Sequence, residues 1–364
     1  MLKWERMGPP AQPAKCYSVA FEPNNPHVIY IACRPQGLFK SIDGGTTWNP
    51  CSVNFPASAS IGANPHSLRI SPNCSSEVWL GVEQHGMFKS SDSGATWTNL
   101  QNGLWGRSLN GICFGFVPGD AKVIYYGSDL GIYKSHDAGV HWSRLYNGLP
   151  RIESNGRFIP STTVSEVLVD ELAPETVYAG FLFTSSQDPC GVYKSIDGGA
   201  SWRPFIEGFP RYTNGSATDP RGIRSLVRHP SQQAVLFASL QNGGIYKLPA
   251  EGEVWQLVND TLPDIVTAVC IHPLRHNVMF AGLKNGGVYH SVDEGQRWTP
   301  MDGGLKVGER MYPREYILKD TDGSVTTLTG YLYESTVYEL HCHLQFPDCL
   351  YAATADGLFK ANIE

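Results

Sequence analysis

The sequence predicts an all-β protein, a seven-bladed β-propeller of four-stranded blades. Three observations carry this prediction: a segment ending in Trp recurs along the 364 residues, two strand-like segments precede each copy, and the composition includes 38 Gly, 25 Pro and 17 Tyr. Many short strands separated by Gly-rich turns at regular spacing are typical of repeated β-sheet units. Such a unit buries its faces only against neighbouring units, so we expect the chain to close into a ring.

The recurring segment has the pattern S-x-D-x-G-x-x-W. Each complete copy places its Trp eleven residues after a leading Gly, as Trp48 follows Gly37. The complete copies begin at Gly37, Gly86, Gly131, Gly191 and Gly287. Two degenerate copies begin at Gly244, where the Ser and Asp are missing, and at Gly357, where the chain ends after one strand. Seven copies predict seven blades in one domain, residues 1–364.

Each copy is predicted to form a strand, a tight turn and a second strand. The apolar and aromatic residues after the leading Gly suit a half-buried strand. In the turn, the Asp side chain accepts hydrogen bonds from backbone amides and the Gly takes a positive φ, while the Trp starts the next strand. Two further strands come first, as in CYSVAFEP (16–23) and HVIYIAC (27–33). Each blade therefore has four strands.

The last blade lacks its fourth strand, and the N-terminus offers one. The segment LKWERMG (2–8) resembles QRWTPMDG (296–303), which places Trp4 where the seventh Trp belongs. We expect this first strand to complete the last blade. Such closure removes the exposed sheet edge that an open ring would leave.

The S-x-D-x-G-x-x-W copies resemble the Asp-box, or bacterial neuraminidase repeat, of sialidases, two-domain xyloglucanases, sortilin-type receptors and photosystem II assembly factors. The resemblance covers essentially the whole chain and implies a propeller fold, whereas the activities it implies range from hydrolase and lyase to binding scaffold. Sialidases carry an early [FY]-R-I-P motif, and here only GRFIP (156–160) is similar, in mid-chain and in a different order. The xyloglucanases use two propellers. Neither catalytic set carries over.

Loop lengths distinguish the two faces of the ring. The turns of the recurring segment are constant in length and share one face, the turn face. All long insertions fall on the opposite face, the loop face, at 54–65, 148–163, 181–189, 208–222 and 302–335. The last insertion alternates like a hairpin around Asp322-Gly323 and is expected to form a lid or side wall. Variable loops on one face of a rigid scaffold usually carry binding and catalysis.

Aligning the innermost strands places polar residues around the channel mouth on the loop face. The aligned positions are Tyr17, His66, Ile112, Ser165, Arg224, Thr267 and Tyr338, followed one residue later by Ser18, Ser67, Cys113, Glu166, Ser225, Ala268 and Glu339. For proton transfer or nucleophilic work the candidates are His66, Tyr338, Glu339 and Glu166. For substrate binding they are Arg224, Tyr17, His85, Arg107, Trp105 and Arg310, with Arg suited to a carboxylate and Trp105 to stacking on a sugar. Lys284 lies in a loop on the same face.

Each candidate also has a structural interpretation. Glu166 and Glu339 could be satisfied structural groups, and Tyr17 and Tyr338 could pack between inner strands. His66 and His85 divide evenly between the two interpretations. Three histidines at matching ends of inner strands are expected to be structural: His229, His272 and His343. No ligand set with metal spacing appears, so no metal or other cofactor is expected.

Charge, terminal sequence and cysteine usage exclude several classes of protein. The net charge is −6, with no cluster of Lys or Arg, which disfavours a nucleic-acid partner. Residues 1–15 lack a signal-like apolar stretch and no run approaches the ~18 residues of a membrane span, so we expect a cytoplasmic protein without a membrane partner. The nine dispersed cysteines, without a C-x-x-C pair, are expected to be reduced.

Two functions follow as hypotheses. The first is an enzyme, a lyase or glycoside hydrolase, that uses general acid/base chemistry on a small acidic or sugar-like ligand in the central pocket. The second is a non-catalytic ligand- or protein-binding or assembly scaffold that uses the same face. The insertions and the Arg, His, Tyr and Glu ring favour the enzyme; the lack of a recognisable catalytic motif favours the scaffold.

Overall fold

The computed structural model describes most of the chain. It leaves out residues 1–2, 10–14, 35–36, 52–64, 83–84, 105–110, 151, 155–156, 160–161, 185–189, 211–221, 242–243, 286, 302–304, 306–310, 320–324, 334–335 and 364. The described residues contain strands and turns but no helix, so none of them forms a helix that could span a membrane.

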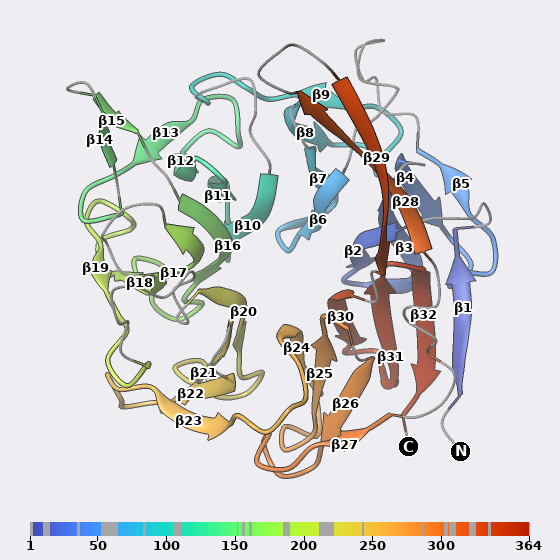
Figure 1. Ribbon diagram of the computed structural model, residues 1–364. Helices are drawn as coiled ribbons and strands as arrows, with labels where there is room; N and C mark the ends of the chain where they lie inside the picture. Colours follow the sequence, from blue (N-terminus) through green and yellow to red (C-terminus); the bar gives the residue numbers. More distant parts are fainter. Residues whose placement is uncertain are drawn as a thin grey trace.

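Seven four-stranded antiparallel sheets are arranged in a ring (Figure 1), which confirms the predicted seven-bladed β-propeller. Blade 1 holds β2 (Lys15–Glu22), β3 (Asn25–Arg34), β4 (Gly37–Ser41) and β5 (Asn49–Pro50). Blade 2 holds β6 (Pro65–Ser71), β7 (Cys74–Val82), β8 (Gly86–Ser90) and β9 (Thr98–Asn99). Blade 3 holds β10 (Gly111–Val117), β11 (Asp120–Ser128), β12 (Gly131–Ser135) and β13 (Ser143–Leu145).

The ring continues through four further blades. Blade 4 holds β16 (Thr162–Val169), β17 (Val177–Thr184), β18 (Gly191–Ser195) and β19 (Arg203–Pro204). Blade 5 holds β20 (Ile223–Arg228), β21 (Leu236–Leu240), β22 (Gly244–Leu248) and β23 (Gln256–Asn259). Blade 6 holds β24 (Val266–Ile271), β25 (Met279–Leu283), β26 (Val288–Ser291) and β27 (Thr299–Pro300). Blade 7 holds β30 (Val337–His343), β31 (Phe346–Thr354), β32 (Gly357–Asn362) and β1 (Trp4–Gly8).

The N-terminal strand completes blade 7, as predicted. β1 pairs antiparallel with β32, with Trp4 opposite Ala361 and Gly8 opposite Leu358. The Trp4 side chain is only 5% exposed and packs with Phe359 and neighbouring apolar residues of blades 6 and 7. Figure 1 shows the two chain ends on this blade. Closure therefore joins the two ends of the sequence within one sheet.

The S-x-D-x-G turns are built by their own polar side chains. The Ser41 hydroxyl donates to Asp43 Oδ1 (2.8 Å) and accepts from the Gly45 amide (2.8 Å), while Asp43 Oδ1 accepts from the Thr47 amide (2.9 Å). Gly45 has a φ of 89°, a conformation that favours Gly. Hydrogen bonds from Thr47 lower the pKa of Asp43 to about 2. The same bonds recur at Ser90–Asp92, Ser135–Asp137, Ser195–Asp197 and Ser291–Asp293. The motif is structural, as predicted.

The apolar core is divided among the interfaces between blades. Ala20 of blade 1 packs in one cluster with Ile70 of blade 2, and Val227 of blade 5 packs with Ile271 of blade 6. Each cluster joins neighbouring sheets, which is how 364 residues fold without one large core.

One disulfide departs from the sequence prediction. Cys16 of β2 and Cys33 of β3 are bonded, so the prediction of reduced thiols is wrong for this pair. They lie directly opposite each other in the strand register, which brings their side chains together. The other seven cysteines are not disulfide-bonded.

Two insertions on the loop face contain hairpins of their own. In the 302–335 insertion, β28 (Met311–Lys319) pairs with β29 (Val325–Tyr333), as the alternating sequence predicted, and no strand of a blade joins this sheet. Its turn lies outside the described residues, and its role as a lid stays a prediction. A shorter hairpin of β14 (Ile152–Ser154) and β15 (Arg157–Ile159) lies in the 148–163 insertion. Figure 1 labels both hairpins.

Candidate functional site

All seven innermost strands carry a bulge at one equivalent position. The pairing with the second strand shifts by one residue around each of these positions: Tyr17, His66, Ile112, Ser165, Arg224, Thr267 and Tyr338. They are the positions that the sequence alignment made equivalent. A bulge interrupts the alternation of side chains, so the bulged residue and the next one can both face the channel.

A cavity of about 440 Å³ lies at the channel on the loop face. Its lining includes five of the residues proposed from the sequence: Tyr17, Glu166, Arg224, Tyr338 and Glu339. Lys284, which follows β25, and Thr336, which precedes β30, also line it and place its mouth on the loop face. This volume falls within the range of roughly 300–1,000 Å³ that is usual for ligand pockets.

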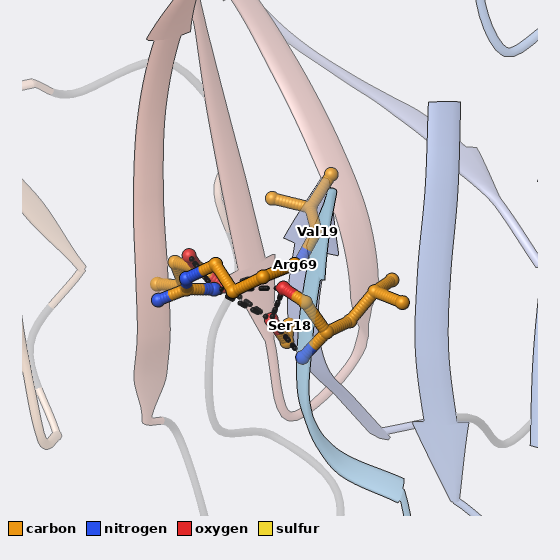
Figure 2. A network of polar contacts seen from close by, with 5 residues as sticks. Ser18, Val19 and Arg69 are labelled. Atoms are coloured by element: carbon orange, nitrogen blue, oxygen red, sulfur yellow. Dashed lines mark hydrogen bonds and ion pairs between the residues drawn. The ribbon is translucent and has the colours of Figure 1, made fainter. Parts of the chain in front are cut away.

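An ion pair between Arg69 and Glu339 lies in this cavity. Arg69 Nη1 is 2.9 Å from Glu339 Oε1, and both side chains are partly exposed. The Ser18 hydroxyl donates to Glu339 Oε2 at 2.7 Å, and the Val19 amide donates to the same oxygen at 3.0 Å. Figure 2 shows this network, with Ser18, Val19 and Arg69 labelled. Both Glu339 oxygens are therefore engaged, and the network joins blades 7, 1 and 2.

Part of this network repeats around the ring. Ser18 Oγ accepts from the Leu68 amide of blade 2 at 3.3 Å, and Ser225 Oγ accepts from the Val269 amide of blade 6 at 3.2 Å. In each case the residue after the bulge receives a backbone N–H from the next blade, as Glu339 does from blade 1. The structural interpretation of Glu339 is thus supported by the geometry.

Burial dominates the electrostatics of Glu166 on β16. Burial raises the pKa of the Glu166 carboxyl from its ordinary 4.5 to about 7; the positive charge of Arg69 opposes this rise and the negative charge of Glu339 adds to it. A carboxyl that titrates near neutral pH can both donate and accept a proton under physiological conditions. Glu166 is therefore the group in the cavity best suited to acid/base chemistry.

The wall formed by blades 5 and 6 is positively charged. Burial lowers the pKa of the Arg224 guanidinium, and its Nε is buried without a hydrogen-bond partner in the described part of the structure. No described carboxylate pairs with Arg224 or with Lys284, which lines the same cavity. The buried Ser67 hydroxyl also lines the cavity and has no hydrogen-bond partner among the described residues. A ligand with an anionic group would satisfy these donors.

The structure describes the other predicted site residues in less detail. Tyr17 and Tyr338 are in ring contact at 4.6 Å, which agrees with their packing interpretation as well as with a place in the cavity wall. His85 follows β7 and is not among the described residues that line the cavity. His66 sits at the bulge of β6, but its side chain lies outside the described structure, as do Trp105, Arg107 and Arg310.

Arg69 is the important residue that the sequence analysis missed. It lies two residues beyond Ser67 on β6 and so projects to the same side of the strand. The sequence did contain a signal for Arg69: it is a charged residue between two apolar neighbours, Leu68 and Ile70, in an inner strand. The aligned channel-mouth positions end one residue after the bulge, whereas Arg69 is the third residue after the bulge of β6.

The three histidines at the far ends of the inner strands are structural, as expected. Nδ1 of His229 accepts from the Gln232 amide at 3.1 Å, and Nδ1 of His272 accepts from the Arg275 amide at 2.9 Å. His343 Nδ1 accepts from an amide of its turn in the same way. Among the described residues, no group of three His, Cys, Asp or Glu side chains could hold a metal ion.

The fold and cavity together define a seven-bladed propeller with a polar pocket on its loop face. No family model matches the sequence, and no curated protein does. Solved structures do resemble it. A GH74 enzyme from Niastella koreensis has a TM-score of 0.68 at 15% identity, over 98% of this chain and 53% of its own. The GH74 xyloglucanase from Xanthomonas campestris has 0.66 at 18% identity, over 98% and 53%.

A third similar structure matches from end to end. YCF48 from Cyanidioschyzon merolae has a TM-score of 0.63 at 16% identity, over 99% of both chains, and a YCF48 structure with a bound D1 peptide has 0.61. The present chain thus spans about half the length of the two GH74 proteins and essentially all of YCF48. At these identities the similarity establishes the fold.

Proposed function

We propose that this protein is an enzyme of the lyase or glycoside-hydrolase type that acts on a small acidic or sugar-like substrate in the central cavity. The observation that carries the proposal is the composition of this cavity. It combines an acid/base carboxyl, Glu166, with two cations that no described carboxylate pairs, Arg224 and Lys284. A ligand that carries an anionic group would fit between these two parts of the wall.

Each residue has a distinct role in this proposal. Arg224 and Lys284 bind the anionic group of the substrate, and Tyr17 forms part of the wall. Glu166 exchanges a proton with the reacting oxygen or carbon. Tyr338 and His66, at bulges beside the same mouth, are the candidates for the second proton transfer. Glu339 is held in place by Arg69 and Ser18, and its negative charge helps to raise the pKa of Glu166.

The loop face supplies the rest of the proposed site. Trp105, Arg107, Arg310 and His85 belong to its connections and would contact the parts of the substrate that extend from the cavity. The 302–335 insertion would cover the bound substrate as a lid. We also infer that the chain is an Asp-box propeller, an inference supported by the hydrogen-bonded S-x-D-x-G turns.

Turnover of a substrate panel tests the enzyme proposal. The panel consists of aryl glycosides with and without a carboxylate on the sugar, incubated with the wild-type chain, Glu166→Gln and the control Glu251→Gln, which changes an exposed carboxyl on the turn face. We expect turnover of carboxylate-bearing members, a loss of about 10²–10⁴-fold in Glu166→Gln, and no change in the control. Equal rates in the wild type and Glu166→Gln would contradict the proposal.

A second function is favoured by one observation. The single-propeller YCF48 matches this chain over its full length, and one of its structures holds a peptide. The present chain would then be a binding or assembly scaffold whose cavity holds a ligand without converting it. Calorimetry with the same panel separates the two functions, because the scaffold predicts heat of binding without product and the enzyme predicts both.

A further inference from the structure

Two thiols meet at the interface between blades 6 and 7. Cys270 lies on β24 and Cys342 on β30, the innermost strands of these blades. Both side chains pack against one apolar cluster that includes Ala268 and Leu340. Both are free and partly exposed, and interaction with the Cys270 thiol is the largest cause that raises the pKa of Cys342. This pair lies outside the residues used by the proposed function.

The repeat explains why these side chains face each other. In blade 7, His341 is the third residue after the bulge, and its ring stacks on Phe21, the fourth residue after the bulge in blade 1, at 4.6 Å between centroids. Cys270 is the third residue after the bulge in blade 6, and Cys342 is the fourth in blade 7. The cysteine pair thus occupies, one blade earlier, the two positions that are in direct contact between blades 7 and 1.

We propose that Cys270 and Cys342 form a disulfide between blades 6 and 7 when the folded protein meets a small-molecule disulfide such as oxidised glutathione. One protein thiolate attacks the small disulfide, forms a mixed disulfide and releases one glutathione thiol. The second cysteine then attacks the protein sulfur of the mixed disulfide and releases the other glutathione. Overall, the two protein thiols are oxidised to one disulfide, and the disulfide of oxidised glutathione takes up two electrons and two protons to become two glutathione thiols.

The nearby Cys349 is the competing partner, and the structure disfavours it. Cys349 lies on β31, and its Sγ contacts Asn362 Oδ1 of β32 at 3.6 Å, within blade 7. A bond between Cys270 and Cys342 would instead join two blades and close a loop of 72 residues, from 270 to 342. Blade 7 is the blade that β1 completes, so the bond would reinforce the closure of the ring. We expect the cross-link to raise the thermal unfolding midpoint by roughly 2–8 °C.

Peptide mapping tests this proposal. The folded wild-type chain and the variants Cys270→Ser, Cys342→Ser and Cys349→Ser are incubated with oxidised glutathione, blocked with N-ethylmaleimide and digested without reduction. We expect a peptide joining residues 270 and 342 in the wild type and in Cys349→Ser, and its absence from the other two variants. The bonded Cys16–Cys33 pair serves as the internal control for detection.

The wild-type chain alone can overturn the inference, so a variant that fails to fold leaves it testable. If Cys270 and Cys342 both remain blocked by maleimide while the Cys16–Cys33 peptide is recovered, the proposed bond does not form. A cross-link that persists in Cys342→Ser or disappears in Cys349→Ser would show that Cys349 is the true partner and would also overturn it.

Discussion

Replacing Glu166 by Gln should stabilise the folded protein at alkaline pH. The pKa of this carboxyl is about 7 in the folded state against an ordinary 4.5, because burial penalises its charged form. Between these pH values the folded state binds the proton more tightly than the unfolded state does. The stability that Glu166 contributes is therefore fully present below pH 4.5 and is lost as the pH rises through 7. Because Gln cannot ionise, the variant does not lose this stability as the pH rises.

The size of the stabilisation by Glu166→Gln follows from the shift in the pKa of Glu166. A difference of 2.5 pH units, from 4.5 to about 7, corresponds to at most about 3 kcal/mol at 1.36 kcal/mol per unit. The Glu166 side chain lines an open cavity and is partly exposed to solvent, which screens its charge and reduces the expected gain to about 1–2 kcal/mol.

Urea unfolding of the wild type, Glu166→Gln and the control Glu251→Gln at pH 4 and pH 8 measures this gain in stability. We expect Glu166→Gln to match the wild type at pH 4 and to exceed it at pH 8. Equal stability at both pH values, or a loss at pH 8, would refute the reasoning.

Two further predictions concern ring closure and the ion pair of the cavity. Trp4→Ala should cost about 3–5 kcal/mol in urea unfolding, because it removes a buried side chain from the blade 7 core, whereas the exposed Glu5→Ala in the same strand should change stability by less than about 0.5 kcal/mol. Similar small effects of both would mean that β1 does not hold the ring closed. Arg69→Met should cost about 1–3 kcal/mol at pH 7, less than a fully buried pair because both side chains are partly exposed, and should raise the pKa of Glu166 further. Unchanged stability together with an unchanged Glu166 titration would show that Arg69 does not act on either carboxyl.

The fold could be predicted because the repeat encodes the blade seven times. The spacing from Gly37 to Trp48 fixes a strand, a turn and a strand, and its recurrence fixes the number of blades. Similarity between the segments around Trp4 and Trp298 placed the N-terminal strand in blade 7. These inferences use local sequence, which is why they held.

The cavity-lining residues that the sequence predicted are those at the aligned positions of the innermost strands. The bulge positions emerged as equivalent, and Tyr17, Glu166, Arg224, Tyr338 and Glu339 line one cavity, while their roles in a site stay a prediction. The Arg69–Glu339 pair joins residues 270 positions apart and depends on how blades 7, 1 and 2 meet, which local patterns do not report.

The disulfide was missed for a related reason. Cys16 and Cys33 are 17 residues apart, and nothing in that spacing marks them as partners. They meet because the bulge at Tyr17 sets the register of β2 against β3 and leaves them directly opposite each other. Register between strands is a property of the folded sheet, and the pattern of cysteines along the chain does not report it.

The titration of Glu166 itself tests the central claim most directly. Carbon NMR of protein labelled at the glutamate side-chain carboxyls, recorded from pH 3 to pH 10, follows each carboxyl, and the signal absent from Glu166→Gln identifies residue 166. The account predicts a midpoint near 7 for this signal. A midpoint near the ordinary 4.5 would show that the cavity does not perturb the carboxyl, and would contradict the role of Glu166 as the acid/base group.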